Sequence, residues 1–314
     1  MNRLVRIALE VIVVLALLGG VYWYYVLDGA VPEASSVQLD INAWRELVRD
    51  DAAQLPTDIR VEFVGRDLIP FAAVEAGGAF EPYTMARTAF QVNGAVGSVV
   101  IDSGMDQALA ESLQREGQRE YDPAAYKRVI AAMGSAVRVA VTHEHPDHIG
   151  GVARFPVPER LTERLAITAP QLEGLRAVAT DGAVPPALAN VKPIDLSAPQ
   201  RIAPGVVMIP AEGHSPGSVM FYVRAWGGRE LLFVGDVAWA LSNIRKPAVR
   251  PRLLQDFFMT PAEQRSKVAE QVRALHNLSK AEPALIIVPS HDNSYIEQLI
   301  TAGVMRQRFL VEAP

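Results

Sequence analysis

Apolar residues recur along most of this chain with a period of either two or about 3.6 residues, and the period changes from segment to segment. Short apolar runs bounded by turn residues predict strands at residues 60–64, 89–92, 98–101, 137–141, 206–210, 218–223, 231–234 and 285–288. Helical spacing predicts helices at residues 39–55, 107–115, 123–133, 170–177 and 261–278, and from Tyr295 onward. The pair Asn93-Gly94 predicts a hairpin turn. Without an internal repeat, one α/β domain is the simplest account.

The N-terminal segment has a different pattern. Residues 11–27 are apolar apart from two glycines, two arginines precede them, and the run ends in four aromatic residues, Tyr22 to Tyr25. Basic residues before a span and aromatic residues at its far end predict an uncleaved anchor in residues 1–28 with the body outside the cytoplasm, on the periplasmic side if bacterial. A cleaved signal peptide, giving a secreted protein, is the alternative, but the first suitable pair of small residues, Ala34 and Ser36, lies well beyond the run.

The composition of the chain excludes several classes of protein. The sequence has 314 residues, is 50% hydrophobic, contains 30 Lys and Arg against 35 Asp and Glu, and has no Cys. It is therefore neither disordered nor disulfide-stapled, and its net charge of −5 does not suit a nucleic-acid binder. We divide it into an anchor or signal segment (1–28), a linker with an amphipathic helix (29–57) and a catalytic domain (58–314).

Three histidines and an aspartate fall within six positions directly after predicted strand 137–141. The chain there reads Thr-His-Glu-His-Pro-Asp-His, which includes His143, His145, Asp147 and His148. Imidazole and carboxylate groups suit Zn²⁺ and neighbouring divalent cations. Alternation at a strand end turns His143 and His145 one way and the next two groups toward a second point. Two adjacent metal ions are the predicted result.

This order resembles the metallo-β-lactamase-fold hydrolase superfamily, whose signature is His-x-His-x-Asp-His after a strand, then an isolated His, an isolated Asp and a final His. The later positions are matched by His214, Asp236 and His291, each directly after a predicted strand. The resemblance covers residues 59–291 and implies an α/β (α+β) fold, a four-layer αββα sandwich. His276, inside predicted helix 261–278, is left over and is expected to be a surface or packing residue.

The resemblance also implies a role for each matched residue. One metal would be held by His143, His145 and His214, the other by Asp147, His148 and His291, with Asp236 bridging both. Zinc is the first expectation, and manganese, iron and cobalt accept the same ligands. Two cations lower the pKa of shared water, so a bridging hydroxide would attack an ester or lactone carbonyl. Asp147 is either a proton shuttle or a ligand only, and Asp102 resembles a buried aspartate that orients a ligand histidine.

Within the superfamily, the chain looks most like the N-acyl homoserine lactonases. The bridging Asp236 argues against a β-lactamase proper, and the absence of an Arg-Asp pair soon after it weakens a glyoxalase II assignment. Those lactonases carry Tyr three positions after the bridging aspartate, where this chain has Trp239. We expect Trp239 at the pocket mouth, with a core position as the alternative. Phosphotriesters, aryl esters and β-lactams remain open as small-molecule substrates, and so does a membrane-tethered metal-binding protein without turnover.

The stretch between Asn243 and Pro261 has four cations in eight residues and then an apolar patch. As a loop over the metals, it would use Arg250 to attract an anionic group and Phe257 and Phe258 to hold an acyl chain. A solvated surface turn and contact with lipid headgroups are the alternatives. The pattern determines no oligomeric state.

Overall fold

Two mixed sheets form the centre of the molecule. The computed structural model describes residues 3–113, 119–259 and 262–311. One sheet has the order β12 (Arg306–Gln307), β1 (Asp58–Pro70), β2 (Pro82–Gly94), β3 (Gly97–Ile101), β5 (Arg138–Ala140) and β6 (Leu165–Ala166), with β4 (Arg119–Tyr121) against β1. The other has the order β11 (Ile286–Val288), β10 (Glu230–Phe233), β9 (Val219–Arg224), β8 (Val206–Pro210) and β7 (Gln200–Ala203).

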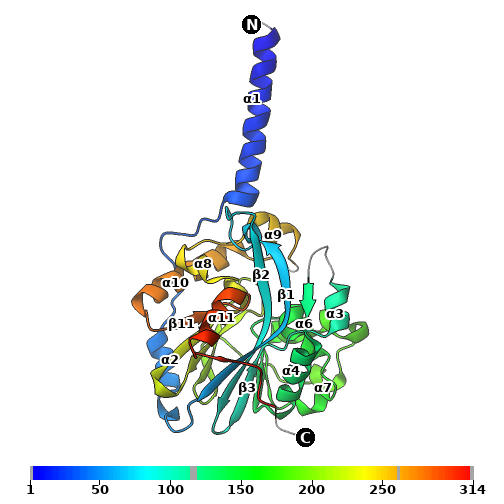
Figure 1. Cartoon of the computed structure of the whole chain (residues 1–314), viewed down its shortest axis with the longest axis vertical. Coiled ribbons are helices and arrows are strands. Elements are labelled where there is room, and N and C mark those ends of the chain that lie inside the picture. The colour runs from blue at the N-terminus through cyan, green and yellow to red at the C-terminus, as the bar shows by residue number, and fades with distance from the viewer. Residues whose placement is uncertain (1–2, 114–118, 260–261, 312–314) are drawn as a thin grey trace.

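Helices cover the outer faces of both sheets (Figure 1). The first sheet packs against α3 (Gln107–Ser112), α4 (Pro123–Ser135), α5 (Pro146–Ala153), α6 (Ala169–Val178) and α7 (Pro186–Ala189). The second packs against α2 (Ile41–Leu47), α8 (Leu241–Arg245) and α10 (Arg265–Ala281). Two further helices are α9 (Arg252–Phe257) and α11 (Asn293–Thr301). The layers confirm the predicted αββα sandwich.

Period-two alternation explains how one strand serves two cores. In β9, Val219, Phe221 and Val223 face the other sheet, whereas Met220 and Tyr222 face the helices of the outer layer. All five are buried, as expected for a strand that is covered on both sides. Successive side chains of such a continuous apolar run therefore pack alternately on the two sides of the sheet.

The hairpin of β1 and β2 is much longer than the sequence pattern predicts. The two strands pair from Asp58 opposite Asn93 to Pro70 opposite Pro82, with a register shift between Phe63 and Gly65. Beyond that shift polar residues interrupt the apolar pattern; one of them, Arg87, makes an ion pair with Asp67 of the facing strand. Cross-strand pairing of charges stabilises a ribbon that has too few apolar residues to be recognised as strand.

Two other local predictions need correction. The turn that joins β2 to β3 consists of residues 95–96, just after the Asn93-Gly94 pair. The helix predicted at residues 39–55 is only α2, Ile41–Leu47, followed by a 3₁₀ turn. It stops there because Asp51 leaves the helical path to bind the Arg201 guanidinium and the Gly205 N–H. A long-range ion pair thus overrides local helical spacing.

The N-terminal segment forms a helix that projects from one end of the sandwich (Figure 1). It consists of α1 (Arg3–Tyr22) and a π-helical turn at Trp23–Leu27, with no buried residue. By length and composition it can cross a membrane, although a signal sequence would pass the same test. The linker after it follows the surface of α10, where Ser35 donates a hydrogen bond to the Glu270 carbonyl and Arg273 to that of Pro32.

Candidate metal centre

Four loops meet at one edge of the sandwich, each directly after a strand. They follow β5, β8, β10 and β11 and carry, in that order, the His143 to His148 cluster, His214, Asp236 and His291. Strands β8 and β10 both run antiparallel to β9, and β11 runs parallel to β10, so their carboxyl ends share one edge. The topology therefore brings together all seven residues proposed as metal ligands.

Four of these residues form a first donor group: His143, His145, His214 and Asp236. His145 Nδ1 lies 2.9 Å from His143 Nε2 and 2.9 Å from His214 Nε2. Asp236 Oδ2 lies 3.4 Å from His214 Nε2 and 3.7 Å from His143 Nε2. Three ring nitrogens and one carboxylate oxygen thus converge on one point, which is the donor set of a divalent metal site.

The remaining three residues, Asp147, His148 and His291, form a second donor group beside the first. His148 Nε2 lies 3.4 Å from His291 Nε2. The other carboxylate oxygen of Asp236, Oδ1, lies 2.9 Å from His291 Nε2 and 3.4 Å from His148 Nε2. Asp236 therefore presents one oxygen to each group, a geometry in which a carboxylate can bridge two metals.

Contacts to the far ring nitrogens fix four of the five histidines. In each case the nitrogen is Nδ1. His143 Nδ1 lies 3.1 Å from Thr142 Oγ1, and His148 Nδ1 lies 2.9 Å from Asp102 Oδ2. His214 Nδ1 lies 2.8 Å from Glu263 Oε2, and His291 Nδ1 lies 2.6 Å from the Ala86 carbonyl. A ring that donates through Nδ1 turns the lone pair of Nε2 toward the centre. The donor set and its orientation fit two divalent cations.

Asp102 lies where the resemblance places an orienting aspartate. It is fully buried and, besides contacting His148, accepts hydrogen bonds from the backbone N–H and hydroxyl of Thr142. Its φ of 63° is in the left-handed region, which a residue other than glycine adopts at a cost. The contacts to Thr142 and His148 compensate for that strain and hold the strand end beside the metal ligands.

Nearby carboxylates raise the pKa of two of the proposed ligands, His148 and His291. Burial favours the neutral ring of His148, but Asp102 and the other nearby carboxylates outweigh it and raise its pKa to about 10. The pKa of His291 is also raised, because Asp236 outweighs burial. By contrast, burial lowers the pKa of His145 to about 3. The carboxylates around the second donor group therefore favour protonation of its two rings, whereas burial disfavours protonation of His145.

We predict that metal uptake releases protons. At pH 7 the His148 ring, whose pKa is raised to about 10, must lose a proton to bind a cation, so loading should release at least one proton per chain, and affinity should rise with pH. Titration calorimetry at pH 7 in buffers of different ionisation enthalpy measures that number. A binding enthalpy that is the same in every buffer would contradict the prediction.

Trp239 contacts the centre from one side. Its indole N–H donates a hydrogen bond of 2.8 Å to Asp236 Oδ2, its ring lies 5.7 Å from that of His291, and it is 9% exposed. The Trp239 N–H therefore already has an acceptor within the protein. Trp239 packs beside the metal site, and its hydrogen bond holds the bridging carboxylate.

The structure corrects the expectation that Arg250 attracts an anionic group. Arg250 is 2% exposed, makes an ion pair with Glu263, and stacks 4.8 Å above the Trp239 ring. Phe257 and Phe258 lie on or just after α9 and are 65% and 48% exposed. Arg250 is therefore inside the protein, whereas the Phe257 and Phe258 rings are at the surface.

Sequence reasoning missed two carboxylates that organise the His214 loop. Glu263 contacts His214 Nδ1 from a position 49 residues away, and its pKa is lowered to about 2 because Arg250 and His214 outweigh burial. Glu144 accepts hydrogen bonds from the Ser215 hydroxyl and the Gly217 N–H. The sequence offered a signal for Glu144, because it lies between His143 and His145, but none for Glu263. The remaining histidine, His276, is buried and lies 2.8 Å from the Ile244 carbonyl, which confirms the packing alternative.

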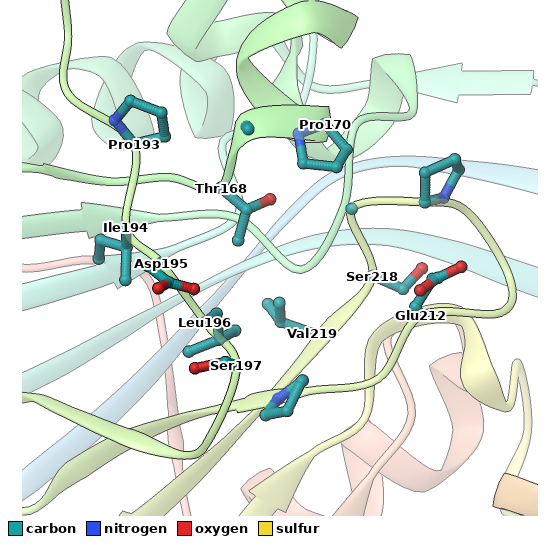
Figure 2. A pocket seen from close by; sticks show the side chains of 14 residues that line it. Thr168, Pro170, Pro193, Ile194, Asp195, Leu196, Ser197, Glu212, Ser218 and Val219 are labelled. Carbon is teal, nitrogen blue, oxygen red and sulfur yellow. The ribbon is translucent and has the colours of Figure 1, made fainter.

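A groove of about 520 Å³ lies on the other side of the His214 loop (Figure 2). Figure 2 shows Asp195 and Glu212 among its lining side chains, together with prolines and Thr168. None of the seven residues of the two donor groups lines it. The groove is therefore separate from the metal centre.

Comparison with known proteins agrees with this geometry. The family model described as the metallo-beta-lactamase superfamily matches residues 88–291, a span that contains both donor groups. No curated protein matches the chain.

Solved structures share the fold. An N-acyl homoserine lactone hydrolase with N-hexanoyl-L-homoserine bound at its catalytic metal centre is 18% identical, with a TM-score of 0.60 over 78% of this chain and 96% of that one. A variant of AiiA from B. thuringiensis with N-decanoyl-L-homoserine at its active site is 18% identical, with a TM-score of 0.58 over the same shares. A probable metal-dependent hydrolase from Staphylococcus aureus is 13% identical, with a TM-score of 0.53 over 76% and 90%. With two thirds of its length matched by the family model and both donor groups inside that span, the chain belongs to the metallo-β-lactamase superfamily.

Proposed function

We propose that this protein is a dinuclear metal-dependent hydrolase that opens ester or lactone bonds. The observation that carries the proposal is Asp236, whose two carboxylate oxygens each face one of two adjacent donor groups. Zinc is the first candidate, because the donors are five imidazoles and two carboxylates, with manganese, iron and cobalt as alternatives. Bound there, two divalent cations would lower the pKa of a shared water toward neutrality and polarise the carbonyl under attack.

The chain's own residues supply positioning and proton transfer. Asp236 fixes the spacing of the two donor groups, and Trp239 holds one of its oxygens. Asp147 Oδ2 lies 3.7 Å from His148 Nε2 and its side chain is 19% exposed, so the carboxylate is partly open to solvent beside the second donor group. Burial acts to raise the pKa of Asp147, but His148 and His291 outweigh it, and the pKa is lowered. As an ionised group at pH 7, Asp147 can take a proton and pass it to the leaving oxygen.

Lactones are the substrate class we favour. The support is the shared fold of the N-acyl homoserine lactone hydrolases, whose product-bound metal centre is known. The main difference from the lactonase pattern is Trp239, which stands where those enzymes carry Tyr. Its N–H donates to Asp236 and therefore does not replace the free hydroxyl of a tyrosine. Recognition of the acyl portion of the substrate then falls to the apolar side chains around Trp239.

The three-part division of the chain completes the proposal. Residues 1–28 would anchor the protein, residues 29–57 would join the anchor to the body, and residues 58–314 would form the catalytic domain. Two arginines before the span and an aromatic end after it support a domain on the outer side of the membrane.

A substrate panel tests the function. The full chain in detergent, loaded with Zn²⁺ or Mn²⁺, is supplied with acyl lactones, aryl esters, phosphotriesters and β-lactams, and proton release is followed. We expect lactone turnover. Turnover of other substrates without lactones would contradict the lactone assignment, and no turnover with two metals bound per chain would contradict the assignment as a hydrolase.

A further inference from the structure

The end of the N-terminal helix is held firmly against the catalytic domain. Arg252 of α9 makes an ion pair of 2.6 Å with Asp28 and stacks 4.4 Å above the Tyr24 ring. Backbone hydrogen bonds join Gly77 to the Val26 carbonyl and Val249 to that of Gly29. The helix therefore does not swing on a free linker, and its axis fixes how the domain faces a membrane (Figure 1).

The depth of this junction follows from helix geometry. Residues 7–27 rise about 30 Å, which matches the hydrocarbon thickness of a bilayer. Glu10 within that stretch is paired with Arg6 one turn earlier. The aromatic end, including Trp23 and Tyr24, then lies at the far interface. Because the Phe257 ring is 5.8 Å from the Tyr25 ring, α9 lies at that same depth.

Large apolar side chains are exposed at this junction. Leu253 and Phe257 are four residues apart on one face of α9 and are 44% and 65% exposed, and Phe80, in the turn that joins β1 to β2, is 71% exposed. We call these three residues the rim. The turn and α9 flank the base of the N-terminal helix (Figure 1), and both contact its last turn through Gly77 and Phe257. The segments that carry the rim therefore lie at the end of the span.

One apolar cluster joins α9 to a residue that contacts the metal centre. Leu254, next to Leu253 in α9, packs in an apolar cluster with Trp239, Tyr83 and Met259. Trp239 in turn donates its N–H to Asp236. A chain of apolar side chains thus leads from the surface at interface depth to the bridging carboxylate.

We infer that the rim inserts into the bilayer beside the anchor and that the metal centre receives its substrate from the membrane, as an amphiphile whose acyl chain stays among the lipids. The inference about substrate delivery rests on the proposed hydrolase function, whereas insertion of the rim does not. Insertion of apolar side chains to the depth of the acyl boundary is how interfacial helices bind membranes.

The absence of cysteine makes insertion directly measurable. Single substitutions Phe80→Cys and Phe257→Cys, and matched controls Val96→Cys and Trp226→Cys, are labelled with a fluorophore in the full chain and reconstituted into phosphatidylcholine vesicles. Val96 and Trp226 are 46% and 65% exposed, and they lie in turns at the opposite end of the sandwich. We expect lipids with acyl-chain nitroxides to quench the rim labels at least about threefold more than the controls. Equal quenching would overturn the inference.

Substrate delivery has its own test. A long-chain lactone is incorporated either into the vesicles that contain the unmodified protein or into separate protein-free vesicles of the same lipid, which are then mixed with the protein-containing vesicles. We expect the initial rate to be at least about tenfold higher when lactone and protein share a bilayer, because lactone in separate vesicles must first cross water, whereas a short-chain soluble lactone is hydrolysed at the same rate in both arrangements. Equal initial rates for the long-chain lactone in the two arrangements would overturn delivery from the membrane. No hydrolysis of either lactone would instead contradict the proposed function, and the quenching result would still decide insertion.

Discussion

Replacing Asp236 by alanine is expected to lower lactone hydrolysis at least about a thousandfold, a loss of about 4 kcal/mol in transition-state stabilisation. One of its oxygens faces the first donor group and the other faces the second. Without them the spacing of the two cations is no longer fixed, and we expect the metal content to fall below two per chain. Steady-state kinetics and metal analysis of the same preparation measure both effects.

Two further variants separate catalysis from folding. Loss of the Asp236 carboxylate also leaves the buried Trp239 N–H without an acceptor, which costs roughly 1–3 kcal/mol of stability. Asp236→Asn keeps an oxygen for that N–H and should fold as well as the natural protein while remaining impaired. Asp50→Ala, at a side chain that is 88% exposed, should change neither property. An Asp236→Ala protein with full turnover would disprove the bridging role.

Replacing Glu263 by alanine is expected to lower the free energy of unfolding by about 3–5 kcal/mol, because it leaves the Arg250 guanidinium buried without its partner. Arg250 is 2% exposed and the Glu263 side chain is fully buried. The pKa of Glu263, lowered to about 2, gives the pH dependence. Its contribution to stability is complete above its ordinary pKa of about 4.3 and is lost as the pH falls toward 2. Urea unfolding at several pH values measures both.

A double variant tells whether Glu263 acts only as a partner for Arg250. Glu263→Leu with Arg250→Met leaves no buried charge and should recover most of the stability. It should still bind metal 10- to 100-fold more weakly, to an order of magnitude, because His214 Nδ1 has lost its carboxylate. Natural affinity in the double variant would exclude an orienting role. As a control, breaking the exposed Lys267–Glu212 pair with Glu212→Ala should cost less than about 1 kcal/mol.

Residues that are close in the sequence were the most predictable part of this site. His143, His145, Asp147 and His148 fall within six positions after one strand, and their residue types alone indicate metal ligands. Their division between two donor groups follows from α5, which begins at Pro146 and carries Asp147 and His148. The later residues His214, Asp236 and His291 could be assigned only through the resemblance to a family, because spacing along the chain does not reveal which strand ends share an edge. The same resemblance predicted the place of Asp102.

Long-range partners were not predictable. Arg250 appears in the sequence as one of four cations in a loop, yet it is buried, and its partner Glu263 contacts a histidine 49 positions away. The polar half of the β1 and β2 hairpin carries too little apolar alternation to be recognised. The helix predicted at residues 39–55 ends early because Asp51 binds Arg201, which is 150 positions further along the chain.

The sequence by itself determined the apolar N-terminal segment, the alternation of strands and helices, and the chemistry of the histidine cluster, because each depends on residue types at fixed local spacing. The family resemblance predicted the places of Asp236 and Asp102, whereas only the tertiary structure decided that Glu263 contacts His214, that Arg250 is buried beside it, and that α9 lies between the anchor and Trp239. These contacts join segments from different strand ends and loops, and their partners are chosen by sheet topology and by the need to pair every buried charge.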